Sequence, residues 1–161
     1  MIPKKLLTII VLVLFSASSS VSWAQMNATI VWDEIKHIAS ENGYKISALI
    51  NQSENGINIT NFSLINKATE TSEVATVEID LLDIQILDRS DGSVEIRPDY
   101  GQEITIKLYE GGEVSSFVLK PLSDNTTMVI SGEVGAPAFQ MNSSLFGLQL
   151  IEYDLPSIYQ G

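Results

Sequence analysis

The sequence contains no cysteine, only one histidine and few basic residues, with 9 lysines and arginines against 20 acidic residues in a chain of 161. Without cysteine the chain can form neither a disulfide nor a cysteine-linked lipid anchor, so the fold must be held together by its core alone. With one histidine and no thiolate, sites for zinc, copper or haem have almost no ligands to draw on. We therefore expect no cofactor.

Residues 1–24 are typical of a secretory signal peptide. Lys4 and Lys5 form a basic start, an apolar run extends from Leu6 to Phe15, and Ser22-Trp23-Ala24 fits a cleavage site. A membrane-spanning helix needs about 20 apolar residues, and this run is only about half as long. We predict cleavage after Ala24, no integral membrane segment afterwards, and a periplasmic or extracellular location. An uncleaved membrane anchor is the alternative.

The remaining chain is strongly acidic. Cleavage leaves 137 of the 161 residues, with 7 basic against 20 acidic side chains and a formal charge of −13. Such a charge argues against nucleic acid and anionic membrane surfaces as electrostatic partners. The length is sufficient for a single domain, 25–161, with a substantial core.

One segment after the leader has the periodicity of a helix. At about 100° per residue, Val31, Trp32, Ile35, Ile38 and Ala39 fall on one stripe, and charged residues fall outside it. Either Asn27 or Thr29 can cap the start, and Asn42-Gly43 supplies a left-handed stop. The pattern predicts an amphipathic helix over 28–43.

From Tyr44 onward the apolar period is two, which predicts strands. Turn signals separate the strand candidates, which we place at 44–50, 57–64, 74–87, 94–98, 103–109, 114–122, 127–134 and 145–153. The apolar phase slips between Ile59 and Phe62, which predicts a bulge or a strand bend there. It slips again at Leu81-Leu82, which suggests that the buried face of this long strand changes sides. The pattern also loosens through Ala136-Pro137.

The expected fold is α+β and mainly β: an N-terminal amphipathic helix followed by a curled antiparallel meander, in the form of a half-barrel or a taco-like sheet. Eight strands at ~4.8 Å spacing make a sheet roughly 38 Å wide, whereas a helix covers a stripe only about 10 Å across. Either the sheet curls, or its open face meets a ligand, a partner or further chain.

No catalytic or metal-binding motif stands out. His37 is four residues from both Asp33 and Glu41, a spacing that usually gives a solvated ion-pair face. Asp88, Asp91-Gly92 and Glu95 superficially suggest a calcium loop, but the EF-hand spacing is not met and a hairpin turn explains them equally well. No nucleophile elbow is present, so we expect no enzyme.

Several stretches carry a resemblance to a known family: VWDEIKHIASENGYKISA, INITNFSLIN and DIQILDRSDGSVEI, behind a signal peptide. Together they resemble the N-terminal part of an uncharacterised family of exported bacterial proteins, domain of unknown function twenty-one twenty-five. The resemblance covers about 29–134 and implies an extracytoplasmic β-rich protein, but no activity. Members of the family are longer, so it also implies that this chain is a fragment or a short relative.

Two functions of different class follow from these expectations. In the first, the concave sheet face binds a lipid or another hydrophobic small molecule. Its expected lining comprises Ile79, Leu81, Ile84, Ile86, Ile106, Leu108 and Leu119. In the second, the protein is a structural or interaction module that docks a protein partner or a second copy through its sheet edge or apolar face.

Overall fold

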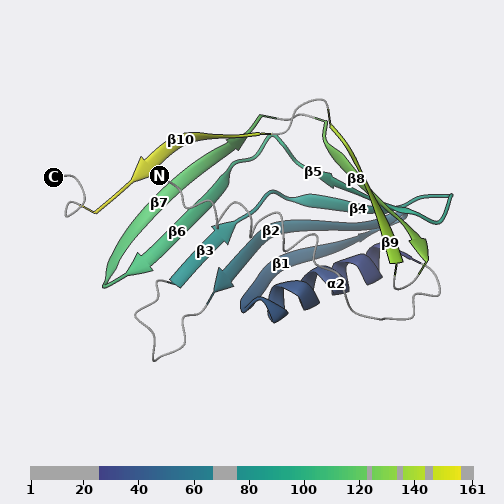
Figure 1. Ribbon diagram of the computed structural model, residues 1–161, viewed down its shortest axis with the longest axis horizontal. Helices are drawn as coiled ribbons and strands as arrows, with labels where there is room; N and C mark the ends of the chain where they lie inside the picture. Colours follow the sequence, from purple (N-terminus) through teal and green to yellow (C-terminus); the bar gives the residue numbers. More distant parts are fainter. Residues whose placement is uncertain (1–25, 67–75, 123–124, 134–135, 144–146, 157–161) are drawn as a thin grey trace.

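The computed structural model describes residues 26–66, 76–122, 125–133, 136–143 and 147–156. These residues form one helix and ten strands in a single antiparallel sheet (Figure 1). The elements are α2 (Ala28–Glu41), β1 (Tyr44–Ser53), β2 (Gly56–Asn66), β3 (Thr76–Asp80), β4 (Ile84–Asp88), β5 (Val94–Pro98), β6 (Ile104–Glu110), β7 (Glu113–Pro121), β8 (Thr127–Glu133), β9 (Ala136–Asn142) and β10 (Leu148–Asp154). The mainly β, α+β fold class is confirmed. The predicted leader, 1–24, lies outside the described residues.

Capping residues define both ends of helix α2. Asn27 is the N-cap, and its side-chain oxygen accepts a hydrogen bond from the Ile30 N–H at 3.0 Å. Asn42 is the C-cap, and Gly43 follows with a φ of 79°, in the left-handed region that glycine tolerates. The Ala28 N–H donates to a carboxylate oxygen of Asp88 at 2.6 Å, which ties the start of the helix to the end of β4.

The apolar stripe of α2 packs on the sheet over β1, β2 and β4. Its centre is Trp32, whose ring meets Phe62 of β2 edge to face at 5.5 Å between centroids. Figure 1 shows the sheet arching over the helix, so the helix lies on the concave side. In the part of the chain that the structure describes, no helix is long and apolar enough to span a bilayer.

The ten strands are segments of six long ones. β3 continues into β4, β5 into β6, β7 into β8 and β9 into β10, and each composite strand pairs with the next along the chain. The predicted meander is therefore correct at the level of these long strands. We call β3, β6, β7 and β10 the β10 wing, and β4, β5, β8 and β9 the β9 wing. Both wings are joined to one side of β2, through β3 and β4, and β1 pairs along the other side of β2.

The line that divides the two wings, which we call the crease, widens away from β2. It begins as an irregularity in β2, opposite Ala48 of β1. At this point of β2, Asn61 has a φ of 52°. Three residues then separate β3 from β4, and five separate the two halves of each further composite strand. The bulge or strand bend predicted between Ile59 and Phe62 is confirmed by this shift in register. It lets the wings splay apart along a line that crosses the whole sheet.

The apolar face does not change sides along 74–87, contrary to the expectation from Leu81-Leu82. Leu64 and Ile59 of β2 pair with Ile46 and Ile50 of β1, two residues that share a face because they are four apart in one strand. Leu64 also pairs with Ile79, and Ile59 with Ile84. The slip in 74–87 thus matches the bulge in β2, and both keep the apolar residues on the concave side.

Among the described elements, strand β9 alone was not predicted from the sequence. Pro137 lies at its start, and the strand pairs only with β8 among the described residues. A proline removes a hydrogen-bond donor, which an edge strand tolerates because only one side of it is paired. The loosened pattern at Ala136-Pro137 was therefore compatible with a strand at the end of a sheet.

Candidate functional site

Asp83 is the centre of the polar contacts that hold the crease near β2. Its carboxylate accepts hydrogen bonds from the backbone N–H of Asn61 at 2.9 Å and from the Gln102 side chain at 2.8 Å. Its own N–H donates to the Gln102 side chain, and its carbonyl oxygen accepts from the Asp99 N–H. Three successive long strands are thereby joined through one residue.

A second group of contacts continues the crease outward. The Tyr100 hydroxyl donates to the Thr126 carbonyl oxygen at 2.9 Å, and the Thr126 hydroxyl lies 2.6 Å from that of Ser143. Burial raises the pKa of the Tyr100 phenol, which therefore stays protonated and able to donate. Beyond Thr126, the Leu122 N–H donates to the Gly147 carbonyl oxygen. These bonds run from the fourth long strand to the last and support the splayed shape.

Apolar side chains form continuous rows across the concave face of the β10 wing. One row follows the cross-strand pairs Leu64, Ile79, Ile106, Phe117 and Tyr153, from β2 to β10. Ile79 has no exposed surface, Phe117 is half-buried, and Tyr153 is 64% exposed. The next row ends in the same way, with Leu119 buried and Leu150 on β10 43% exposed. The apolar cover is lost toward β10.

The β9 wing repeats this gradient. Its row follows the pairs Ile57, Ile86, Ile96, Met128 and Met141, from β2 to β9. Ile86 has no exposed surface, whereas Met141 is 54% exposed. In both wings the concave face is closed near α2 and open at the last long strand.

The seven side chains predicted to line a ligand site divide into two groups. Four are buried in the core, namely Ile79, Ile86, Ile106 and Leu119. Three are half-buried and pack against that core: Leu81, Ile84 and Leu108. All except Leu81 lie in strands, on the concave face, and Leu81 lies in the crease. The structure therefore brings them to one face, where the four buried ones have almost no surface left for a ligand.

Strand β10 combines exposed apolar side chains with an unpaired edge. It pairs with β7, and no other described strand lies along its second side. Leu148, Leu150 and Tyr153 point to the concave face, whereas Gln149, Glu152 and Asp154 point to the opposite face. Ile151 is an extra residue in a bulge and is 43% exposed. Such an edge offers backbone donors and acceptors beside an apolar surface.

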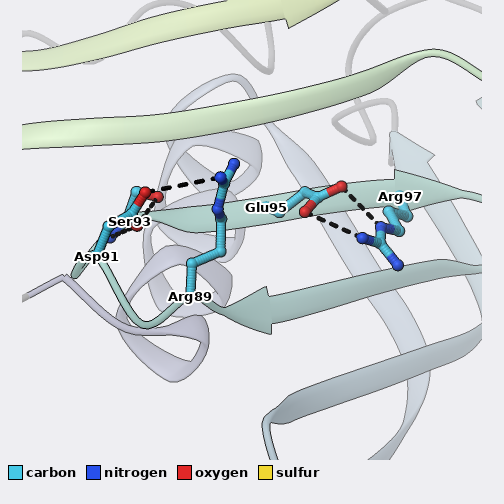
Figure 2. Close-up of polar contacts among 5 residues, drawn as sticks. All are labelled: Arg89, Asp91, Ser93, Glu95 and Arg97. Carbon is cyan, nitrogen blue, oxygen red and sulfur yellow. Dashed lines mark hydrogen bonds and ion pairs between the residues drawn. The ribbon is translucent and has the colours of Figure 1, made fainter.

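The residues that suggested a calcium loop have other partners. The Asp91 carboxylate accepts hydrogen bonds from the N–H and hydroxyl of Ser93, which lower the pKa of Asp91, and Arg89 lies 3.6 Å away (Figure 2). Glu95 binds Arg97 through both carboxylate oxygens, at 2.7 and 3.1 Å (Figure 2). The third carboxylate, that of Asp88, accepts from α2. The Asp91 contacts stabilise the turn between β4 and β5, whereas Glu95 pairs within β5 and Asp88 binds the start of α2, so each carboxylate has its own partner.

The single histidine likewise occupies an exposed helix surface. His37 lies 3.3 Å from Glu41, one turn further along α2, and both side chains are more than half exposed. In the described ranges there is no group of three or more histidine, cysteine or acidic residues that could hold a metal ion.

Sequence reasoning overlooked Met141, Leu150 and Tyr153 as surface residues of interest. Leu150 was assigned to a strand, but its place at the sheet's end depends on the pairing order, which periodicity does not give. Met141 belongs to the missed strand β9. The alternation of Phe139 and Met141 with polar Gln140 and Asn142 was the available signal.

Comparisons with known proteins give this chain no relatives to reason from. No protein-family model matches it, and neither the curated proteins nor the solved structures include a significant match. The resemblance to the domain of unknown function twenty-one twenty-five stays a prediction.

Proposed function

We propose that this protein is a non-enzymatic, exported β-rich module that docks a strand of another protein along β10. The observation that carries the proposal is that the apolar rows and the backbone ladder of the β10 wing both end at this strand. An added strand would extend both at once. Its backbone would bond to the edge, and alternate side chains would cover Leu150 and Tyr153.

Export is part of this proposal and rests on the predicted leader, 1–24, together with the family resemblance. An exported chain without cysteine relies on packing and hydrogen bonds, and the crease provides many of the latter. A periplasmic or extracellular module of this kind acts by contact, which agrees with the absence of a catalytic motif from the sequence.

Site-specific photo-crosslinking tests the docking proposal. A photoreactive phenylalanine analogue replaces Tyr153 in the cells that produce the protein. As a matched control it replaces Tyr109, which is 38% exposed on β6, a strand paired on both sides. We expect a discrete protein adduct from position 153 and none from position 109, with mass spectrometry locating the partner's cross-linked segment in an extended strand. No adduct at position 153, or equal adducts at both positions, would contradict the proposal.

A second candidate function is the binding of a lipid or another hydrophobic small molecule on the concave face of the sheet. Ligand binding is favoured by Met141 of the β9 wing, which is exposed on the same concave face as Leu150 and Tyr153.

Native mass spectrometry of residues 25–161, purified without detergent and followed by organic extraction, tests this second function. A monomer with a stoichiometric apolar ligand, lost in Met141→Lys, would favour binding. A bare protein would leave docking as the better explanation.

A further inference from the structure

The polar face of β10 carries charge of one sign. Glu152 and Asp154 are both exposed, and β10 contains no lysine or arginine. Edge strands are commonly protected by lysine, whereas this one presents carboxylates. These charges bear on the chemistry of the docked strand, and an inference from them rests on the docking function proposed above.

The neighbouring strands leave these two carboxylates unneutralised. Glu152 and Asp154 stand beside Val118 and Ser116 of β7. The next basic residue in that direction, Lys107 of β6, lies 3.6 Å from Asp80, so an acidic partner already faces it. Neither carboxylate forms an ion pair with a described residue, so both are available to a basic side chain on an added strand.

The opposite end of β10 differs. Gln149 pairs with Lys120 of β7, whose side chain is exposed. A basic residue placed there would meet the neutral Gln149 and would lie two strand spacings, about 9.6 Å, from Lys120. It would therefore gain no charge pair. The charge pattern thus gives the edge a direction, with attraction for positive charge at Glu152 and Asp154 only.

The same pattern opposes a second copy as the occupant. Pairing β10 with β10 of another chain would bring two sets of Glu152 and Asp154 to one short edge. Each chain without the predicted leader also carries a formal charge of −13. Like charges across a strand pair are destabilising, and a high net charge of one sign favours the monomer.

We infer that β10 accepts an extended strand of a different protein, with basic residues opposite Glu152 and Asp154 and apolar residues beside Leu150 and Tyr153. The apolar side chains would complete the rows of the concave face, and the basic ones would select this partner over an acidic strand or a second copy.

Synthetic strand peptides test the inference on the chain 25–161. The probe is a peptide that alternates valine with lysine over about nine residues, which is within the usual range of strand lengths. One control replaces lysine by glutamate, and another keeps lysine but carries N-methyl groups on alternate amides. Fluorescence anisotropy measures the affinity, and backbone hydrogen exchange locates the site. We expect only the unmethylated lysine peptide to bind and to protect amides of β10.

Two paired variants separate the charge effect from general electrostatics. Glu152→Gln with Asp154→Asn should weaken binding of the lysine peptide about fivefold, the effect of two exposed charge pairs. The control, Glu54→Gln with Glu103→Gln, removes the same charge from exposed positions outside β10 and should leave the affinity unchanged. Equal weakening by both pairs would overturn the inference.

The peptides also distinguish failure of the inference from failure of the docking function. If the glutamate peptide protects β10 as well as the lysine peptide does, docking stands and the charge selection is wrong. If the chain instead self-associates with protection of β10, the second copy is the occupant and the inference is again wrong. If the N-methylated peptide binds equally well, or if no peptide protects β10, the docking function itself fails.

Discussion

Leu64 and Tyr153 stand at opposite ends of one apolar row, yet their surroundings differ almost completely. Leu64 lies on β2, between two paired strands, and is 4% exposed. Tyr153 lies on β10, with a neighbour on one side only among the described strands, and is 64% exposed. The alternation of apolar residues is the same at both ends. Position in the sheet, more than side-chain type, decides whether such a residue contributes to stability or is available for contact.

The row itself provides the largest expected effect. Ile79→Ala should lower the free energy of unfolding by about 2–5 kcal/mol, because Ile79 is fully buried and its loss leaves a cavity. Tyr153→Ala at the outer end should change it by no more than about 0.5 kcal/mol. Urea denaturation followed by circular dichroism measures both. Similar losses for the two variants would mean that Tyr153 is covered in solution and would end the comparison.

The crease also bears on the difference between the inner and outer ends of the rows, because it sets the angle between the two wings that carry them. Asp83→Ala removes the acceptor for Asn61 and Gln102 and should cost about 1–3 kcal/mol. Asp99→Ala is the matched control, since the Asp99 side chain accepts a local bond from the Gly101 N–H, two residues away. It should cost at most about 1 kcal/mol. Thermal melting of both variants checks the difference, and equal midpoints would show that Asp83 does not support the crease.

Local features of this fold were predictable from sequence because their causes are local. Asn27 and Asn42-Gly43 bound the helix through caps that involve neighbouring residues. The phase slip before Phe62 likewise revealed the bulge at Asn61. In each case the signal and the structure lie within a few residues of one another.

Pairing between distant segments was less accessible. Taken alone, the slip at Leu81-Leu82 predicts a change of buried face, because the matching slip in β2 becomes relevant only once the two strands are known to pair. Strand β9 was missed because Pro137 counts against a strand unless the strand is known to lie at an edge. The same limit applies to the candidate site. Alternation in the sequence points to Ile79 and Ile106, whereas the exposed side chains available for contact lie at the outer end of the apolar row, on β10.

The smallest expected effect lies on the solvent side of β5, midway between β2 and the outer strand β9. The two hydrogen bonds from Arg97 hold the pKa of Glu95 below its ordinary value. A lowered pKa in the folded state means that the contribution to stability is present above the unfolded pKa and is lost as pH falls through the folded pKa. Because Arg97 is half exposed, solvent screening limits this contribution to less than about 1 kcal/mol. Unfolding free energies of the wild type and of Glu95→Gln, measured from about pH 6 to about pH 3, should converge toward the acid end. A constant difference between them across that range would show that the pair adds nothing, and that the stability of this strand comes from Ile96 and its row on the concave face.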